Sequence, residues 1–264
     1  MAAGYIVTDE PDMNPGWWCA PSQQQYNAKA NLLAGVPKDG RATMVNFGLG
    51  IMASRDCGLD PKPYVQGFGA YESDDQYFYT DDGFEDSRAV GLADNRLTTE
   101  QTRRASNYGI VVNRLRDMND HKIPVWGFVE VGCPFTNGNC INANQVRAAM
   151  WHEIIAGARG IDLFNHSFSG SCQNNSDLRQ ACYAAVRSMV QSVTAQIQQI
   201  APALNGPEAS GLVTVSEPSG CFPSGSPGWM LRRSGTTALR SSWPATMTTR
   251  PAPRRSPSLA RGPL

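Results

Sequence analysis

The stretch PVWGFVEV, residues 124–131, places an apolar run between Pro124 and a single acidic side chain, Glu130. A short, nearly continuous apolar run is typical of a strand covered on both faces, as in parallel sheets. Because side chains alternate between the two faces of a strand, Trp126, Phe128 and Glu130 share one side. A glutamate at the end of an apolar strand is costly to bury unless something uses it. We therefore expect this strand to carry part of a functional site.

Four further runs are expected to form strands, at residues 4–8 (GYIVT), 42–47 (ATMVNF), 75–79 (DQYFY) and 160–164 (GIDLF). Between and after them, helical periodicity favours helices at residues 23–33, 99–119, 144–156 and 178–200. Asn144 is expected to cap the third helix, and the apolar stripe of the fourth should end at Pro202. The alternation of strands and helices predicts a parallel sheet with helical crossovers.

Two architectures fit this alternation, an open doubly wound sheet or part of a closed barrel. In barrels, reactive residues lie where strands end. The residues expected at or just after strand ends are Glu10, Asn46, Tyr77, Glu130 and His166. A Gly-x-Gly-x-x-Gly motif after a strand, which an open nucleotide-binding sheet would need, is absent from the sequence. We therefore predict an α/β fold that is a partial (β/α)8 TIM barrel.

Composition narrows the classes of function. The 264 residues carry 23 basic and 23 acidic side chains, but seven arginines follow Glu217 with no Asp, Glu or Lys among them. The remaining chain therefore has 16 basic against 23 acidic groups, a net charge of −7. An acidic body argues against a nucleic-acid partner. No apolar run approaches the length of a membrane span, and nothing in the sequence indicates a protein partner.

The domain organisation is expected to change after residue 205. Residues 1–205 would form the barrel portion, and residues 206–221 a linker with the first strand of an accessory β-domain at 212–215. Residues 222–264 are rich in Pro, Ser, Thr and Arg without periodicity. They are interpreted either as a disordered tail or, as we favour, as an out-of-frame translation of GC-rich sequence.

Seven cysteines are many for a cytosolic enzyme. The favoured pairing is Cys133–Cys140, Cys172–Cys182 and Cys19–Cys57, which leaves Cys221 unpaired; unpaired thiols are the alternative. Disulfides would imply an oxidising, secreted or extracytoplasmic location. The first residues, MAAGYIV, lack the basic region and the long apolar stretch of a signal peptide.

Three motifs resemble the clan A glycoside hydrolases, a TIM-barrel superfamily. Its acid/base glutamate ends the fourth strand, commonly in Asn-Glu-Pro, and its nucleophile glutamate ends the seventh. Thr-Asp-Glu-Pro at 8–11 is similar to the first motif and Val-Glu-Val at 129–131 to the second, with two expected strands between them. Residues 157–164 (GARGIDLF) resemble the passage into the eighth strand.

The resemblance implies that Glu10 is the acid/base and Glu130 the nucleophile of a retaining enzyme that cleaves a poly- or oligosaccharide. Asp9 stands where the family has asparagine, and its charge would raise the pKa of Glu10. The chain would begin at the fourth strand, as a fragment of such a barrel. Residues expected to bind the sugar are Asp9, Asp12, Trp17, Trp18, Asn46, Tyr77, Trp126 and His166.

Other classes of function remain as alternatives. A non-catalytic carbohydrate-binding or structural barrel would keep the same pocket without cleaving the sugar. An open-sheet hydrolase or dehydrogenase would need a nucleophile elbow or a phosphate loop, and the sequence has neither. No cofactor is expected. No metal site is expected either, because His152-Glu153 is followed by Ala156 where a His-Glu-x-x-His motif requires histidine.

Overall fold

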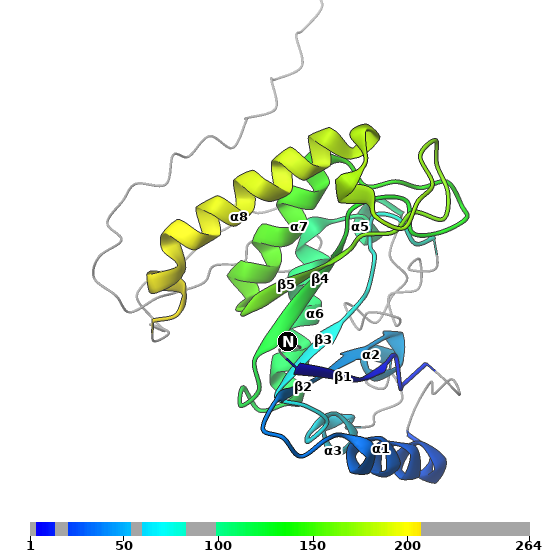
Figure 1. The fold of residues 1–264 in the computed structure, drawn as a ribbon, viewed down its shortest axis with the longest axis vertical. Helices are drawn as coiled ribbons and strands as arrows, with labels where there is room; N and C mark the ends of the chain where they lie inside the picture. Colours follow the sequence, from blue (N-terminus) through cyan, green and yellow to red (C-terminus); the bar gives the residue numbers. More distant parts are fainter. Residues whose placement is uncertain (1–3, 14–20, 54–59, 83–98, 207–264) are drawn as a thin grey trace, which may run out of the picture.

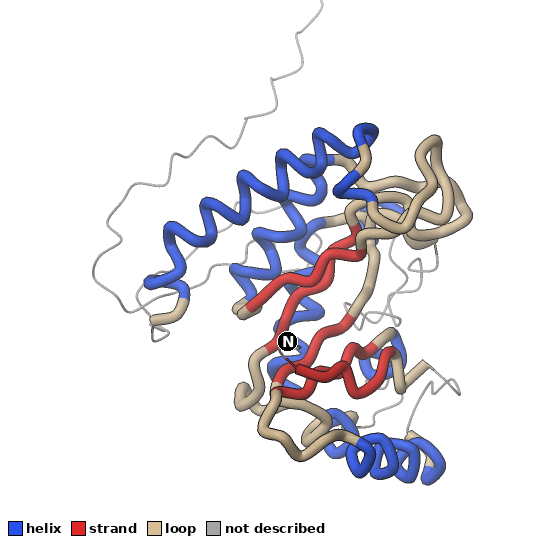
Figure 2. Tube along the Cα trace, in the orientation of Figure 1, coloured by secondary structure: helices blue, strands red, loops and turns tan. Residues whose placement is uncertain are grey.

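The computed structural model describes residues 4–13, 21–53, 60–82 and 99–206. Five parallel strands form one sheet in sequential order, and the sheet curls through about half a barrel (Figure 2). The strands are β1 (Gly4–Asp9), β2 (Ala42–Phe47), β3 (Tyr71–Asp74), β4 (Val125–Glu130) and β5 (Gly160–Phe164). The parallel sheet in sequential order confirms the expected α/β class.

Helices follow the strands and cover the convex face of the sheet (Figure 1). They are α1 (Gln23–Gly35), α2 (Leu49–Ala53), α3 (Lys62–Val65), α5 (Thr99–Thr102), α6 (Ala105–Met118), α7 (Ala143–Ala156) and α8 (Ala184–Leu204), with 3-10 turns η3 (Asp177–Arg179) and η4 (Ala181–Tyr183). Helix α6 packs on β3 and β4, and α7 packs between α6 and α8. Within the described ranges, no helix is long and apolar enough to cross a membrane.

Alternation along β4 separates the core from the site. Val125 and Val129 are buried against the helices. Gly127 faces the same way, and a Cβ there would lie 2.1 Å from a carboxyl oxygen of Glu153 on α7, so only glycine fits. Trp126 therefore projects to the opposite, concave face, where its ring stacks on Tyr71 of β3 at 4.9 Å. Glu130 lies at the end of the row of β4 side chains that point to this concave face.

Two strands have the expected bounds, β2 and β5, but the third strand does not. The expected strand at 75–79 is wrong: β3 is Tyr71–Asp74, and residues 75–81 form a loop and a turn. Sequence YESD looks like a loop because Glu72 and Asp74 are acidic, yet both are buried. In the aromatic run, Tyr77 and Phe78 are buried and Tyr79 is partly buried, and none of the three pairs as a strand.

Helix boundaries also differ from expectation in three places. The helix expected at 99–119 is divided into α5 and α6. Helix α7 is capped by Asn142 and not by Asn144, because the Asn142 side chain accepts from the N–H groups of Asn144 and Gln145 while Gln145 reaches back in a capping box. Helix α8 begins only at Ala184 and continues through Pro202 to Leu204.

Both disulfides expected in the described part of the chain are present. Cys133–Cys140 has a Cα–Cα separation of 4.2 Å and Cys172–Cys182 one of 6.6 Å. They indicate an oxidising, extracytoplasmic setting. Cys19, Cys57, Cys221, the strand expected at 212–215 and the tail at 222–264 lie outside the described residues.

Candidate active site

Glu10 lies directly after β1 at the carboxyl edge of the sheet and has a left-handed backbone, with φ of +42°. A non-glycine residue adopts this conformation at a cost, and such residues cluster at functional sites. Its N–H donates to the carbonyl of Asn46 on β2 at 2.8 Å, and its carbonyl accepts from Met13 at 3.0 Å. The neighbouring strand and the turn after it therefore hold Glu10 in place.

The carboxyl of Glu10 is hydrogen-bonded to the carboxyl of Asp75, the first residue after β3. Burial is the main cause that raises the pKa of both groups, to about 9 for Asp75. The shared bond lowers the pKa of Glu10 and raises that of Asp75. One proton can therefore join the two carboxyls, and burial favours its position on Asp75.

A polar row on β1, β2 and β3 supports this pair. The Asn46 side chain donates to Asp9 at 2.9 Å and accepts from the Ser73 hydroxyl at 2.7 Å. Asn46 also lowers the pKa of Asp75, against the larger effect of burial. The structure thus brings Asp9, Asn46 and Glu10 together, as the sequence predicted for one strand-end edge.

Glu130 is fully buried at the end of β4 and has three side-chain hydrogen bonds. The hydroxyl of Tyr108, in the first turn of α6, lies 2.8 Å from both carboxyl oxygens, and the Thr80 hydroxyl donates to Oε1 at 3.2 Å. Burial raises the pKa of Glu130 to about 7, and the bonds from Tyr108 and Thr80 partly oppose it. Glu130 can therefore be ionised or neutral near neutral pH.

Tyr77 lies among the three carboxyls. Its hydroxyl donates to Asp75 at 3.2 Å. Burial raises the pKa of Tyr77, and the negative charges of Asp75, Glu130 and Glu10 raise it further. Its ring packs against Phe164 at 5.2 Å and Phe128 at 6.0 Å. Tyr77 was expected at the end of a strand; it lies three residues beyond β3 and bonds Asp75.

The other expected sugar-binding residues are spread more widely. Asp12 is fully buried and accepts from the N–H groups of Gly48 and Ile51 at 2.9 and 2.8 Å, so it caps the start of α2. Trp126 lies four residues before Glu130, about 13 Å away along the strand. His166 follows β5 and its ring stacks on those of Phe164 and Phe168, at 6.2 and 4.1 Å, and Phe164 in turn contacts Tyr77. Trp17 and Trp18 lie outside the described residues.

Sequence reasoning did not single out three residues of the site, Asp75, Thr80 and Tyr108. Asp75 could have been recognised if the strand before it had been placed at residues 71–74. Tyr108 belongs to an amphipathic helix and Thr80 to a turn, so each contacts Glu130 only through the tertiary fold. No local pattern indicates either contact.

Among the described residues, no group of three or more His, Cys, Asp or Glu side chains is placed to bind a metal ion. The arrangement can support proton transfer, because burial raises the pKa of Asp75 beside Glu10 to about 9 and that of Glu130 to about 7. No family model and no curated protein sequence matches the chain.

Proposed function

We propose that the protein is a secreted retaining glycoside hydrolase of TIM-barrel type that cleaves O-glycosidic bonds in a poly- or oligosaccharide. Glu10 acts as acid/base and Glu130 as nucleophile. The observation that carries this proposal is that Glu10 follows β1 and Glu130 ends β4 at the same carboxyl edge of a curled parallel sheet, with Tyr77 bonded to Asp75 and its pKa raised by the charges of both glutamates. The half-barrel shape is compatible with the TIM-barrel part of the proposal.

The two roles follow from the surroundings of each carboxyl. Glycoside hydrolysis needs one protonated carboxyl for the leaving oxygen and one ionised carboxyl. Glu10 has a proton available from Asp75, and after the leaving group departs it can accept a proton from water. Glu130 has hydroxyl donors that favour its ionised form, as a nucleophile requires.

Substrate entry requires a local movement in this proposal. Glu130 has no exposed surface, and Thr80 and Tyr108 bond its carboxyl. A sugar can reach Glu130 only if part of the cover over its carboxyl moves. In many enzymes a segment opens to admit substrate and then closes over it, which excludes water from the reacting groups.

The proposal is tested by replacing each carboxyl in the full chain. Glu130→Gln should abolish turnover of aryl glycosides, and a 2-fluoro glycoside should label the wild-type protein at Glu130, as read by peptide mass spectrometry. Glu10→Gln should lose about 100-fold or more on natural substrates but far less on aryl glycosides whose leaving group needs no proton. Glu100→Gln, at an exposed position of α5, is the matched control.

One observation favours a second candidate, a non-catalytic carbohydrate-binding or structural barrel. The complete burial of Glu130 and the contact of Tyr108 with both of its oxygens would also suit a carboxyl that only ties β4 to α6. Equal and small effects of Glu10→Gln and Glu130→Gln on turnover would favour this candidate. Retained sugar binding by calorimetry, with no hydrolysis of any substrate, would do the same.

A further inference from the structure

The loop that follows β4 is closed on itself by the Cys133–Cys140 disulfide. It begins three residues after Glu130, so it leaves the same strand end as the candidate nucleophile. Gly138 within it has φ of +83°, a conformation that suits glycine in a tight turn. Cys133 is anchored further because its N–H donates to the Ser167 hydroxyl at 2.8 Å. The loop is therefore fixed at both ends.

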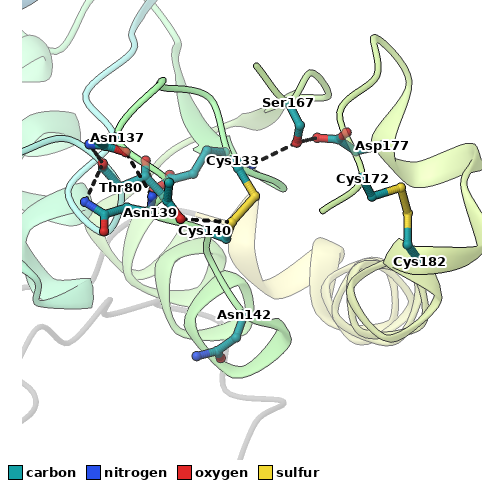
Figure 3. The surroundings of a disulfide bond; sticks show 12 residues. Thr80, Cys133, Asn137, Asn139, Cys140, Asn142, Ser167, Cys172, Asp177 and Cys182 are labelled. Carbon is teal, nitrogen blue, oxygen red and sulfur yellow. Dashed lines mark hydrogen bonds between the residues drawn. A yellow bond between two sulfur atoms is a disulfide. The ribbon is translucent and has the colours of Figure 1, made fainter. Parts of the chain in front are cut away.

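Two asparagines of this loop hold one carbonyl on another segment. The side chain of Asn137 donates to the carbonyl of Thr80 at 2.8 Å, and that of Asn139 lies 3.3 Å from the same oxygen (Figure 3). Asn139 also donates to Asp82 at 2.6 Å, and its own N–H donates to the Asn137 side chain at 2.9 Å. The disulfide loop thus holds the turn at residues 77–82 from outside.

Thr80 connects the two asparagines to Glu130. Thr80 is fully buried, and its hydroxyl donates to Glu130 Oε1 at 3.2 Å. The carbonyl held by the asparagines and the hydroxyl that bonds the carboxyl belong to the same residue. Fixing the backbone of Thr80 therefore fixes the position from which its hydroxyl can donate.

We propose that the disulfide-closed loop 133–140 is a positioning element for Glu130, with Asn137 and Asn139 as positioning residues that act through Thr80. The loop, not the turn alone, keeps the Thr80 hydroxyl on the carboxyl. The role assigned to Glu130 in catalysis rests on the proposed function, whereas the positioning of Thr80 does not.

The second disulfide provides a matched control. Cys172–Cys182 lies with Ser167 and Asp177 on the side of Cys133 opposite to Thr80 (Figure 3). Its two cysteines are 10 residues apart in sequence, against 7 for Cys133 and Cys140, so the two disulfides close loops of similar length. Removing Cys172–Cys182 leaves the contacts of Asn137 and Asn139 with Thr80 in place. Asn144→Ala, at an exposed position of α7, is the control for the loss of an amide.

The test uses the full chain with Asn137→Ala and with the double variant Cys133→Ser/Cys140→Ser. Amide hydrogen exchange at Thr80 and Asp81, whose N–H groups donate to the Tyr77 carbonyl, reports the stability of the turn. We expect about tenfold faster exchange in both variants but not in Cys172→Ser/Cys182→Ser or Asn144→Ala. The kcat on an aryl glycoside should fall about tenfold in the same two variants, and its acid limb should move to higher pH.

Unchanged exchange at Thr80 and Asp81 in Asn137→Ala would overturn the inference, whether or not the double serine variant folds. Equal acceleration in the two control variants would also overturn it, because the effect would then be global. Faster exchange in a protein that hydrolyses no glycoside would support the positioning of Thr80 and reject the proposed function instead. The exchange measurement and the activity measurement therefore separate the two claims.

Discussion

Glu10 and Asp75 share a hydrogen bond that can exist only while the pair holds at least one proton. Two carboxyls that share a proton have their titrations pushed apart, and the proton stays with the group whose ionisation is more costly. Burial makes that group Asp75. A strained backbone at Glu10 and the hydroxyl of Tyr77 on Asp75 hold the geometry. The Glu10–Asp75 pair thus keeps a proton beside the carboxyl of the acid/base candidate, Glu10.

Asp75→Asn is expected to remove that stored proton while keeping a hydrogen-bond donor toward Glu10. In the wild type, kcat/KM should fall only when the pair loses its last proton near pH 9, because the pKa of Asp75 is raised to about 9. In the variant, Glu10 alone carries the proton, so the alkaline limb should move to lower pH. The pH profile of kcat/KM on a natural oligosaccharide checks this, and an unmoved limb would exclude Asp75 as proton donor.

At the scale of elements, the local sequence pattern was sufficient to predict the bounds of a strand where the strand is a distinct apolar run. The apolar runs of β2 and β5 have the predicted bounds because a short, mostly apolar run between polar and glycine-containing segments leaves little ambiguity. Strand β3 was missed because its acidic side chains are buried against residues that are distant in sequence. One of these is Asn119, whose side chain donates to Glu72 at 3.1 Å. Such partners are distant in sequence, so no local periodicity indicates them.

The start of α7 gives a prediction at this scale. Asn142 and Asn144 are both exposed, but only Asn142 accepts from the backbone at N2 and N3. Asn142→Ala should lower the free energy of unfolding by about 1 kcal/mol, whereas Asn144→Ala should change it by less than about 0.5 kcal/mol. Urea unfolding under non-reducing conditions measures both. Equal losses would mean that the cap does not govern this helix start.

At the scale of the whole molecule, the sequence was enough to predict that polar residues would gather at one edge of a parallel sheet. It indicated Glu10, Asn46 and Glu130 because each lies at a strand end. It could not indicate which helix or turn would contact them, since Tyr108 and Thr80 approach from elements whose place is set by packing. The same packing decided that Asp12 caps the start of α2.

Packing also buries an unusual number of acidic groups, and their pKa values shift in the same direction. Burial is the main cause that raises the pKa of Glu72 and of Glu130 to about 7 and that of Asp75 to about 9. A folded-state pKa above the unfolded value means that the folded protein binds more protons. The free energy of unfolding is then largest below the unfolded pKa values and decreases as pH rises through the folded ones.

We therefore expect the protein to be more stable at pH 5 than at pH 8, the reverse of proteins whose carboxylates are ion-paired. Glu72 provides the test because it is fully buried and lies outside the candidate site. Its shift from 4.5 to about 7 corresponds to a contribution on the order of 3 kcal/mol. Glu72→Gln keeps the shape of the neutral acid, so it should reduce the difference between the two pH values by that order, whereas Glu100→Gln should not. Urea unfolding at both pH values with the disulfides intact measures the differences. A wild-type stability that is flat or rising from pH 5 to pH 8 would show that these carboxyls are ionised in the folded protein.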